Sequence, residues 1–214
     1  RDKQSSAVDV LFPFVDVEEV GKRLNCDADD ASGVVIWTTT PWTLPANRGV
    51  ALSAVLDYVL LAVAGRGVLV AEALAETCAQ RFGADEVTVL GRAKGADLEG
   101  LLLLPPFDDQ PVPIVLGEHV TTDAGTGCVH TAPAHGQEDF EMGRRYNLEV
   151  YNPVGGNGVY HPGTPVFAGQ HIFKANDDIV AALADRQRLL CHEPFEHSYP
   201  HCWRHKTPII FRAT

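Results

Sequence analysis

The chain has 214 residues, of which 45% are hydrophobic and 21% are charged, with 19 glycines and 14 prolines. This length and composition predict one folded domain with a substantial core, and no apolar run approaches the roughly 20 residues of a membrane span. The formal net charge of −11 argues against a protein that encloses nucleic-acid phosphates, although contact with a short single-stranded end stays open.

Short apolar stretches rich in Val, Ile and Leu, and bounded by Gly, Pro or Asp, predict strands along most of the chain. We expect strands at 8–17, 33–40, 58–65, 67–70, 86–91, 112–117 and 127–132. The AGRG sequence at 64–67 predicts a hairpin turn between two of these strands.

Three stretches predict helices. Residues 71–82 precede Gly83, a plausible helix C-cap. Residues 137–146 carry acidic side chains in the first turn, where they complement the helix dipole. Residues 176–190 begin with an asparagine cap and carry apolar residues at helical spacing.

Strands with helices inserted irregularly predict an α+β fold, β-rich, with a distorted β-barrel core and flanking helices. We expect a single domain over residues 1–214, with an ordered loop at 151–170 that is dense in Gly and Pro. Residues 196–214 predict an extended C-terminal segment that leaves the domain.

Five cysteines lie at positions 26, 78, 128, 191 and 202. An odd number at scattered positions does not form the pattern of a disulfide framework, and a reducing, cytoplasmic setting is expected. The first residues, RDKQSSAVDV, lack the apolar core of a signal peptide.

The stretch WTTTPWTLPAN at 37–47 places three threonines at the end of an expected strand. Hydroxyl groups at a strand end can satisfy local backbone groups. Next to an aromatic residue they would also suit a ribose, an adenine or a bound water, and loops at strand ends often carry sites. Both interpretations remain open at this point.

The stretch GCVHTAPAHGQED at 127–139 admits several chemistries. Cys128 and His130 could form a nucleophile pair, because residues two apart on a strand face the same side. His130 and His135, with Glu138 or Asp139, could bind a metal and form a metallohydrolase. In a third interpretation Asp139 presents its carboxylate to a ligand's ammonium group and His130 lines the pocket. Purely structural roles also remain open.

His197, His201, Cys202 and His205 have a spacing that resembles half of a zinc site. A structural zinc site needs four well-placed ligands, commonly from two such pairs, and no CxxC occurs in the chain. A polar strand anchored by Trp203 is therefore the preferred interpretation.

Taken together, these motifs resemble the inserted editing domain (connective polypeptide 1) of isoleucyl-tRNA synthetases. WTTTPWTLPAN, GTGCVHTAPAHGQEDF, NPVGGNGVY, FKAND and HSYPHCWRHKTPIIFRAT occur in the family's order and span nearly the whole chain. Leucyl and valyl relatives typically have TTRP where this chain has Thr39-Thr40-Pro41-Trp42, and Met or Lys at the position of His130. The HIGH and KMSKS signatures of the synthetase are missing from this sequence.

The resemblance implies hydrolysis of the aminoacyl ester of valyl-tRNA(Ile), and of valyl-adenylate in the full enzyme, with isoleucine rejected by size. The implied partners are the 3′ acceptor end of tRNA(Ile) carrying valine and the remainder of the synthetase chain, to which 196–214 would lead back. No membrane, metal, cofactor or covalent intermediate is implied. The alternatives are a silent fragment that binds valine or its adenylate, and the metallohydrolase.

The resemblance also implies roles for individual residues. Asp139 would bind the substrate's ammonium group, and His130 would exclude isoleucine. Thr38, Thr39 and Thr40 match the threonine-rich peptide that contacts the terminal adenosine and helps position the attacking water, and Trp42 matches its aromatic residue. The family commonly has Ala at position 128, so Cys128 is not expected to be a nucleophile. At the C-terminal cluster His205 stands where some relatives have a zinc-binding cysteine.

Overall fold

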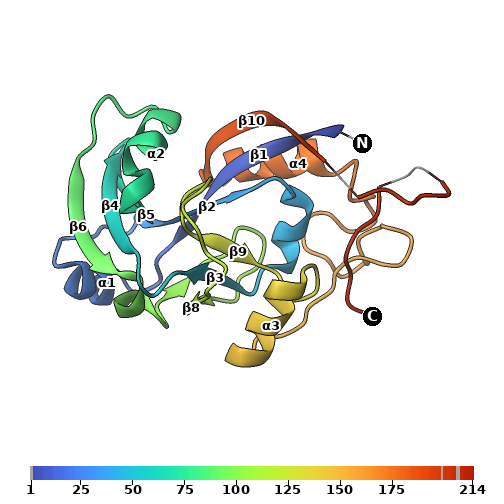
Figure 1. Ribbon diagram of the computed structural model, residues 1–214, viewed down its shortest axis with the longest axis horizontal. Coiled ribbons are helices and arrows are strands. Elements are labelled where there is room, and N and C mark those ends of the chain that lie inside the picture. The colour runs from blue at the N-terminus through green and yellow to red at the C-terminus, as the bar shows by residue number, and fades with distance from the viewer. Residues whose placement is uncertain (1, 199, 206–207) are drawn as a thin grey trace.

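The structure, a computed structural model, describes residues 2–198, 200–205 and 208–214, and the side chains of residues 2–4, 197 and 198 lie outside this description. Strands occupy the centre of the molecule and helices lie around them (Figure 1). Within the described ranges, no helix is both long and apolar enough to cross a membrane.

The strands are β1 (Asp2–Pro13), β2 (Gly33–Thr38), β3 (Gly49–Leu52), β4 (Asp57–Val63), β5 (Arg66–Ala71), β6 (Val89–Lys94), β7 (Leu102–Leu103), β8 (Val112–Leu116), β9 (Val129–Thr131) and β10 (Leu189–Ser198). The α-helices are α1 (Val17–Leu24), α2 (Ala75–Arg81), α3 (Gln137–Tyr146) and α4 (Asn176–Asp185). Short 3-10 helices span Pro41–Ala46, Glu72–Leu74 and Gly95–Leu98.

The described strands form two sheets, with the orders β10-β1-β2-β5-β4-β6 and β7-β8-β3-β9. Neighbouring strands are antiparallel except for β2 with β5 and β3 with β8. The predicted β-rich α+β class is thereby confirmed. The described ladders do not close into a barrel, although an isolated bridge between Phe14, directly after β1, and Leu103 of β7 joins the two sheets at one point.

The strands β2, β4 and β5 are buried on both faces, because helix α2 covers the side that faces away from the main core. Alternate residues of a strand point in opposite directions, so Val34 and Ile36 of β2 belong to the main core while Val35 belongs to a second cluster. That second cluster packs against Cys78 and Ala79 of α2. Double-sided burial explains why these strands are continuous apolar runs in the sequence.

Several local sequence signals are confirmed. The AGRG turn joins β4 to β5 with positive φ at Ala64 and Gly65, as a two-residue type I′ hairpin requires. Gly83 follows the end of α2 with φ +79°, and its amide donates to the Gln80 carbonyl (3.1 Å). The helix expected at 137–146 is α3, with the same limits.

The strand expected at 8–17 is wrong at both ends, since β1 runs from Asp2 to Pro13 and α1 begins at Val17. The sequence does contain a helix-start signal here, namely Asp16 followed by Glu19 three residues later, but the apolar strand pattern of the preceding residues was given more weight. Asp16 caps α1 by accepting a hydrogen bond from the Glu19 amide (3.0 Å), which is the spacing of a capping box.

The helix expected at 176–190 begins at Asn176 as expected, but its cap and its C-terminal end are wrong. Ala175 occupies the N-cap position without a side-chain hydrogen bond, so Asn176 is not the cap. The helix ends at Asp185, Gln187 has a positive φ of 57°, and β10 starts at Leu189. Residues from Leu189 onward form a strand because they pair with β1 along most of the length of β10. Helical spacing within the segment cannot reveal a partner so distant in the sequence. The strand expected at 86–91 starts later, at Val89.

The loop at 151–170 is ordered, as predicted. Short bridges pair Val154 with Tyr160 and Val159 with His171, and Tyr160 and Phe167 are almost fully buried. The Gly- and Pro-rich composition therefore marks a folded excursion that contributes to the main core.

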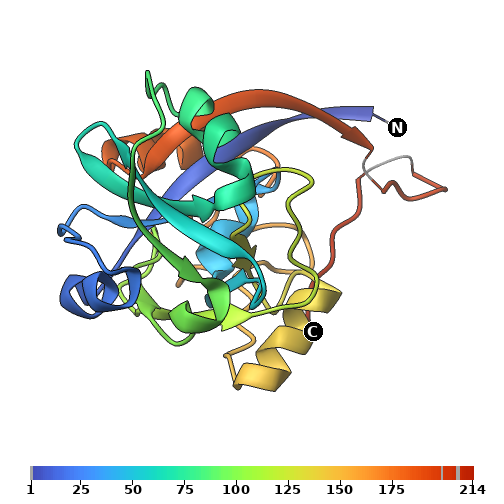
Figure 2. The same cartoon turned by 60° about the vertical axis from the view of Figure 1, so that its left-hand side comes forward.

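The C-terminal residues turn back towards the domain after β10. Figure 2 shows this segment ending beside α3. The Ala213 amide donates to the Ala134 carbonyl (2.8 Å), and Asn152 Nδ2 donates to the Ala213 carbonyl (2.7 Å). The segment thereby contacts the loop that precedes α3, and its continuation into a larger chain remains a prediction.

Candidate functional site

A cavity of about 200 Å³ lies where the end of β2, the 3-10 helix Pro41–Ala46, β9 and the start of α3 meet. Its lining consists of Trp37, Thr38, Thr40, Thr43, Val129, His130, Ala132, His135 and Asp139. The fold thus brings the two motifs of the sequence, 37–47 and 127–139, into one site. Among the predicted site residues, Thr38, Thr40, His130 and Asp139 belong to this lining.

The threonines differ in position. The Thr40 amide donates to Thr38 Oγ1 (3.1 Å), and the two hydroxyl oxygens lie 3.3 Å apart. Thr39 lies outside the described lining, and its carbonyl accepts a hydrogen bond from Ser5 Oγ (3.3 Å). The peptide therefore presents two hydroxyl groups to the cavity and is tied to β1 through the third residue.

Trp42 also lies outside the described lining of the cavity. Its side chain is buried, and its ring meets the imidazole of His135 edge-on, with centroids 5.0 Å apart. Its carbonyl accepts a hydrogen bond from the Tyr160 hydroxyl (2.6 Å). Trp42 thus supports a wall residue of the cavity from behind.

His130 is held on both sides of its ring. Its Nδ1 lies 2.7 Å from Asn47 Nδ2 and its Nε2 lies 2.8 Å from Thr43 Oγ1. Asn47 Nδ2 also donates to the Gly49 carbonyl (2.9 Å), so the amide group faces two acceptors and His130 Nδ1 is one of them. The hydroxyl of Thr43 donates to the Thr40 carbonyl (2.9 Å), which leaves its oxygen to accept from His130 Nε2–H. These contacts define one neutral tautomer.

Asn47 and Thr43 hold His130 in place, and the sequence analysis did not single them out. Both belong to WTTTPWTLPAN, in which the three consecutive threonines at 38–40 drew the interpretation instead. A spacing of four residues on a helical turn places two side chains on the same side, and this was the signal available in the sequence. Only the contact with β9 shows that both side chains face His130.

The His130 imidazole titrates far below its ordinary range. Burial, and secondarily the proximity of His135, lowers its pKa from 6.5 to about 3. A second ring proton would also face the Asn47 amide hydrogens, which is unfavourable. At neutral pH the side chain is therefore an uncharged, rigid wall.

We expect acid to destabilise the folded chain through His130. Because its pKa falls from 6.5 to about 3 on folding, the unfolded chain binds more protons between these values. The stability contributed by this group is complete above pH 6.5 and falls by roughly 1.4 kcal/mol for each pH unit below it.

Urea unfolding of the wild-type chain and of His130→Gln, between neutral pH and about pH 5, measures this term. The variant should lose less stability than the wild type as the pH falls. Equal pH slopes for the two proteins would contradict the assignment.

Asp139 lies in the first turn of α3 and is half-buried. Its Oδ2 accepts a hydrogen bond from the Ala132 amide (3.1 Å), and the described residues give its Oδ1 no partner. Burial raises the pKa of this carboxyl, and Glu138 adds to the rise, while the Ala132 amide and His119 oppose it. A cationic ligand in the cavity would offset the cost of burying this charge.

His135 forms the outer wall of the cavity. Its Nδ1 lies 2.9 Å from the Phe211 carbonyl, and burial lowers its pKa. Its Nε2 is buried and has no hydrogen-bond partner among the described residues. The C-terminal segment thus reaches the site through this side chain.

Cys128 belongs to the core and not to the cavity. Its side chain is 2% exposed and its Sγ lies 3.9 Å from the Leu69 carbonyl. Burial raises the pKa of the thiol strongly. A buried, protonated thiol is a poor nucleophile, so the expected same-side pairing of Cys128 with His130 does not create a catalytic pair.

Neither candidate metal cluster is assembled in the described part of the chain, where no group of three or more His, Cys, Asp or Glu residues could hold a metal ion. Both ring nitrogens of His130 are engaged within the protein. In the C-terminal cluster, Cys202 Sγ lies 3.5 Å from His205 Nδ1, and the side chain of His197 lies outside the described residues.

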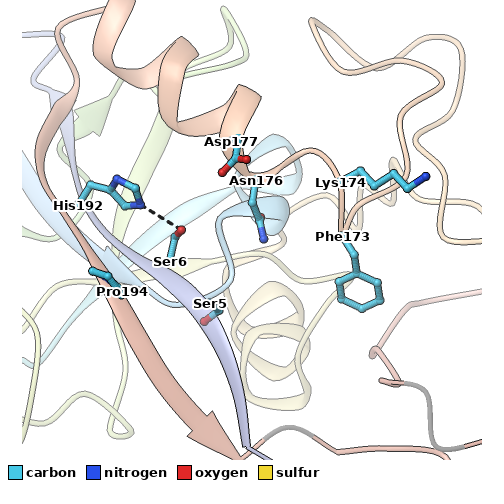
Figure 3. Close-up of a pocket in the computed structure, with 8 residues that line it drawn as sticks. All are labelled: Ser5, Ser6, Phe173, Lys174, Asn176, Asp177, His192 and Pro194. Carbon is cyan, nitrogen blue, oxygen red and sulfur yellow. Dashed lines mark hydrogen bonds between the residues drawn. The ribbon is translucent and has the colours of Figure 1, made fainter.

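A larger hollow of about 550 Å³ lies between β1, β10 and the start of α4 (Figure 3). In it Ser6 Oγ and His192 Nε2 are joined by a hydrogen bond of 3.0 Å. Asn176 lies opposite them, and the Lys174 side chain points away from the pair (Figure 3). None of the predicted site residues lines this hollow. The larger of these two cavities is therefore not the one in which the two sequence motifs meet.

A match to a family model assigns this fold, with its cavity between the two motifs, to the editing domains of aminoacyl-tRNA synthetases. The family model described as "Leucyl-tRNA synthetase, editing domain" matches residues 18–160, and the chain belongs to this family. A solved structure, "The crystal structure of GlLeuRS-CP1", superposes with a TM-score of 0.69 over 91% of this chain and 100% of that chain, at 13% identity. That likeness establishes the fold.

Over its whole length the chain is 56% identical to isoleucine–tRNA ligase of Shewanella amazonensis and 54% identical to that of Shewanella sediminis. It spans 23% of the length of these relatives. The resemblance to the editing domain of isoleucyl-tRNA synthetases, drawn from the motifs, is thereby confirmed.

Proposed function

We propose that this chain is a proofreading hydrolase that cleaves the aminoacyl ester of valyl-tRNA(Ile), and valyl-adenylate within the full synthetase, while rejecting isoleucine by size. The observation that carries the proposal is a single cavity lined by both the half-buried carboxylate of Asp139 and the neutral, immobilised ring of His130. One group suits a ligand's ammonium, and the other limits the size of its side chain.

Asp139 binds the ammonium group of the aminoacyl ligand in this proposal. One carboxylate oxygen is fixed by the Ala132 amide, so the other is oriented for a charge-assisted hydrogen bond with the ligand. A free ammonium distinguishes an aminoacyl ester from other esters, and this contact therefore selects the substrate class.

His130 measures the ligand's side chain. A pocket that accepts isoleucine cannot exclude the smaller valine, and this pair is a standard example of that limit. A second, smaller pocket can accept valine and exclude isoleucine by overlap. The hydrogen bonds to Asn47 and Thr43 hold the His130 ring against such overlap, because moving it would leave buried polar groups unpaired.

The threonine peptide positions the rest of the substrate and the attacking water. The hydroxyls of Thr38 and Thr40 line the cavity and offer donors and acceptors to the terminal ribose. Thr39 and Trp42 act through their neighbours, Thr39 by anchoring the peptide to Ser5 and Trp42 by supporting His135. Catalysis then rests on positioning and on polarisation of the ester, with no cofactor.

The acceptor end of tRNA(Ile) and the remainder of a cytoplasmic synthetase are the proposed partners. The net charge of −11 predicts weak, salt-sensitive tRNA binding by this chain alone. Most tRNA contacts would come from the rest of the synthetase, to which residues 196–214 lead back.

Single-turnover hydrolysis with the chain in excess over valyl-tRNA(Ile) tests the proposal. We expect release of valine that is unaffected by EDTA, and little release of isoleucine from isoleucyl-tRNA(Ile). Loss of activity with EDTA would support the metallohydrolase. Binding of a valyl-adenosine analogue without any hydrolysis would identify a silent binding fragment.

A further inference from the structure

His135 carries a polar atom that the described fold leaves unsatisfied. Its Nδ1 contacts the Phe211 carbonyl at 2.9 Å, and a carbonyl oxygen can only accept, so the ring proton of the neutral imidazole lies on Nδ1. Its Nε2 is then a lone-pair acceptor. This atom is buried, without a partner among the described residues, in a side chain that lines the cavity.

Other polar side chains of the cavity are already engaged within the protein. His130 uses both ring nitrogens for Asn47 and Thr43, and Thr38 Oγ1 accepts from the Thr40 amide. His135 Nε2 and Asp139 Oδ1 remain as acceptors without hydrogen-bond partners among the described residues. These two acceptors, together with the negative charge of the Asp139 carboxylate, match a ligand group that only donates hydrogen bonds, such as an ammonium.

The surroundings of His135 hold its ring in one orientation. The Trp42 ring packs against it edge-on, with 5.0 Å between the ring centroids. The Phe211 carbonyl, which belongs to the C-terminal segment, fixes the tautomer of the His135 ring. Burial keeps the pKa of this imidazole lowered, with Arg212 adding to the effect. An uncharged ring accepts from an ammonium, whereas a charged one would repel it.

We propose that His135 Nε2 is a second acceptor for the ligand's α-ammonium group, beside Asp139, and that the C-terminal segment sets this role through the Phe211 carbonyl. The inference rests on the proposed function and deepens it, since ammonium recognition then depends on His135 of the loop before α3 and on Asp139 of the first turn of α3. It also makes residues 208–214 part of the site.

The test compares two non-hydrolysable adenosine conjugates, one carrying valine and one carrying its desamino counterpart. In the wild-type chain with ¹⁵N-labelled histidine, the valine conjugate should shift the Nε2 resonance of His135 and the desamino conjugate should not. Equal shifts with both conjugates, or no shift with the valine conjugate at saturation, would overturn the inference.

His135→Phe keeps an aromatic ring against Trp42 and removes the acceptor. It should weaken binding of the valine conjugate roughly tenfold or more and leave the desamino conjugate unchanged, while His135→Gln, which restores an acceptor near the Nε2 position, should recover part of the loss. Equal losses for both conjugates would indicate a structural role and overturn the inference.

The same experiments separate this inference from the proposed function. If the wild-type chain hydrolyses valyl-tRNA(Ile) but His135 shows neither the resonance shift nor the selective loss, the inference alone fails. If the wild-type chain binds neither conjugate and does not hydrolyse the ester, both fail.

Discussion

Replacing Asp139 by asparagine is expected to lower the rate of valyl-tRNA(Ile) hydrolysis by roughly a hundredfold or more, because it removes the charged partner of a desolvated ammonium group. Asparagine retains an oxygen for the Ala132 amide, which Asp139 Oδ2 bonds at 3.1 Å, so the start of α3 keeps its local contact. Single-turnover rates over a range of protein concentrations measure the loss.

Glu138→Gln is the matched control. It removes the same charge one residue away in the same helical turn, from an exposed side chain outside the described lining of the cavity. Its rate should stay close to that of the wild type. Similar losses in both variants would show that the charge of the helix terminus matters and not the carboxylate in the cavity.

Replacing His130 by alanine is expected to let the chain cleave isoleucyl-tRNA(Ile), raising that rate by roughly tenfold or more. The wall that excludes the additional methylene would be missing. The change also leaves Asn47 and Thr43 without their partner, so we expect the free energy of unfolding to fall by roughly 1–3 kcal/mol.

The ratio of kcat/KM for the valyl and isoleucyl esters is the relevant measurement, because a reduced folded fraction affects both values equally. Cys128→Ala is its control, since this side chain is buried in the core two residues away and lies outside the described lining. The control should keep both the activity and the preference for valine. An unchanged preference in His130→Ala would contradict the steric role.

The sequence predicted those parts of the fold that depend on local physics. The limits of α3, the hairpin between β4 and β5 and the C-terminal end of α2 follow from charges, turn residues and a glycine with positive φ. The boundary between α4 and β10 was wrong because pairing with β1, from the other end of the chain, overrides local helical spacing.

The candidate site was predictable only where its residues lie close together in the sequence. His130 and Asp139 lie nine positions apart in one motif, and the family resemblance assigned them their expected roles. Asn47 contacts His130 of β9, and His135 contacts the carbonyl of Phe211, which is distant in sequence. These two contacts form only in the tertiary fold, and the sequence around Asn47 or His135 does not predict them.

Trp42 illustrates the limit of assigning a role from a motif. Its match to the family's threonine-rich strip implied contact with the ligand, yet the ring is buried behind His135 and outside the described lining. The structure shows a supporting position for this residue, and direct contact with adenosine stays a prediction.

A structure of the chain with a non-hydrolysable valyl-adenosine conjugate tests the central claim most directly. We predict that the ligand occupies the cavity of about 200 Å³ between β2, β9 and α3, with its ammonium group at Asp139 Oδ1 and its isopropyl group against the His130 ring. Density in the larger hollow between β1, β10 and α4, or a valyl group turned away from both residues, would contradict the account.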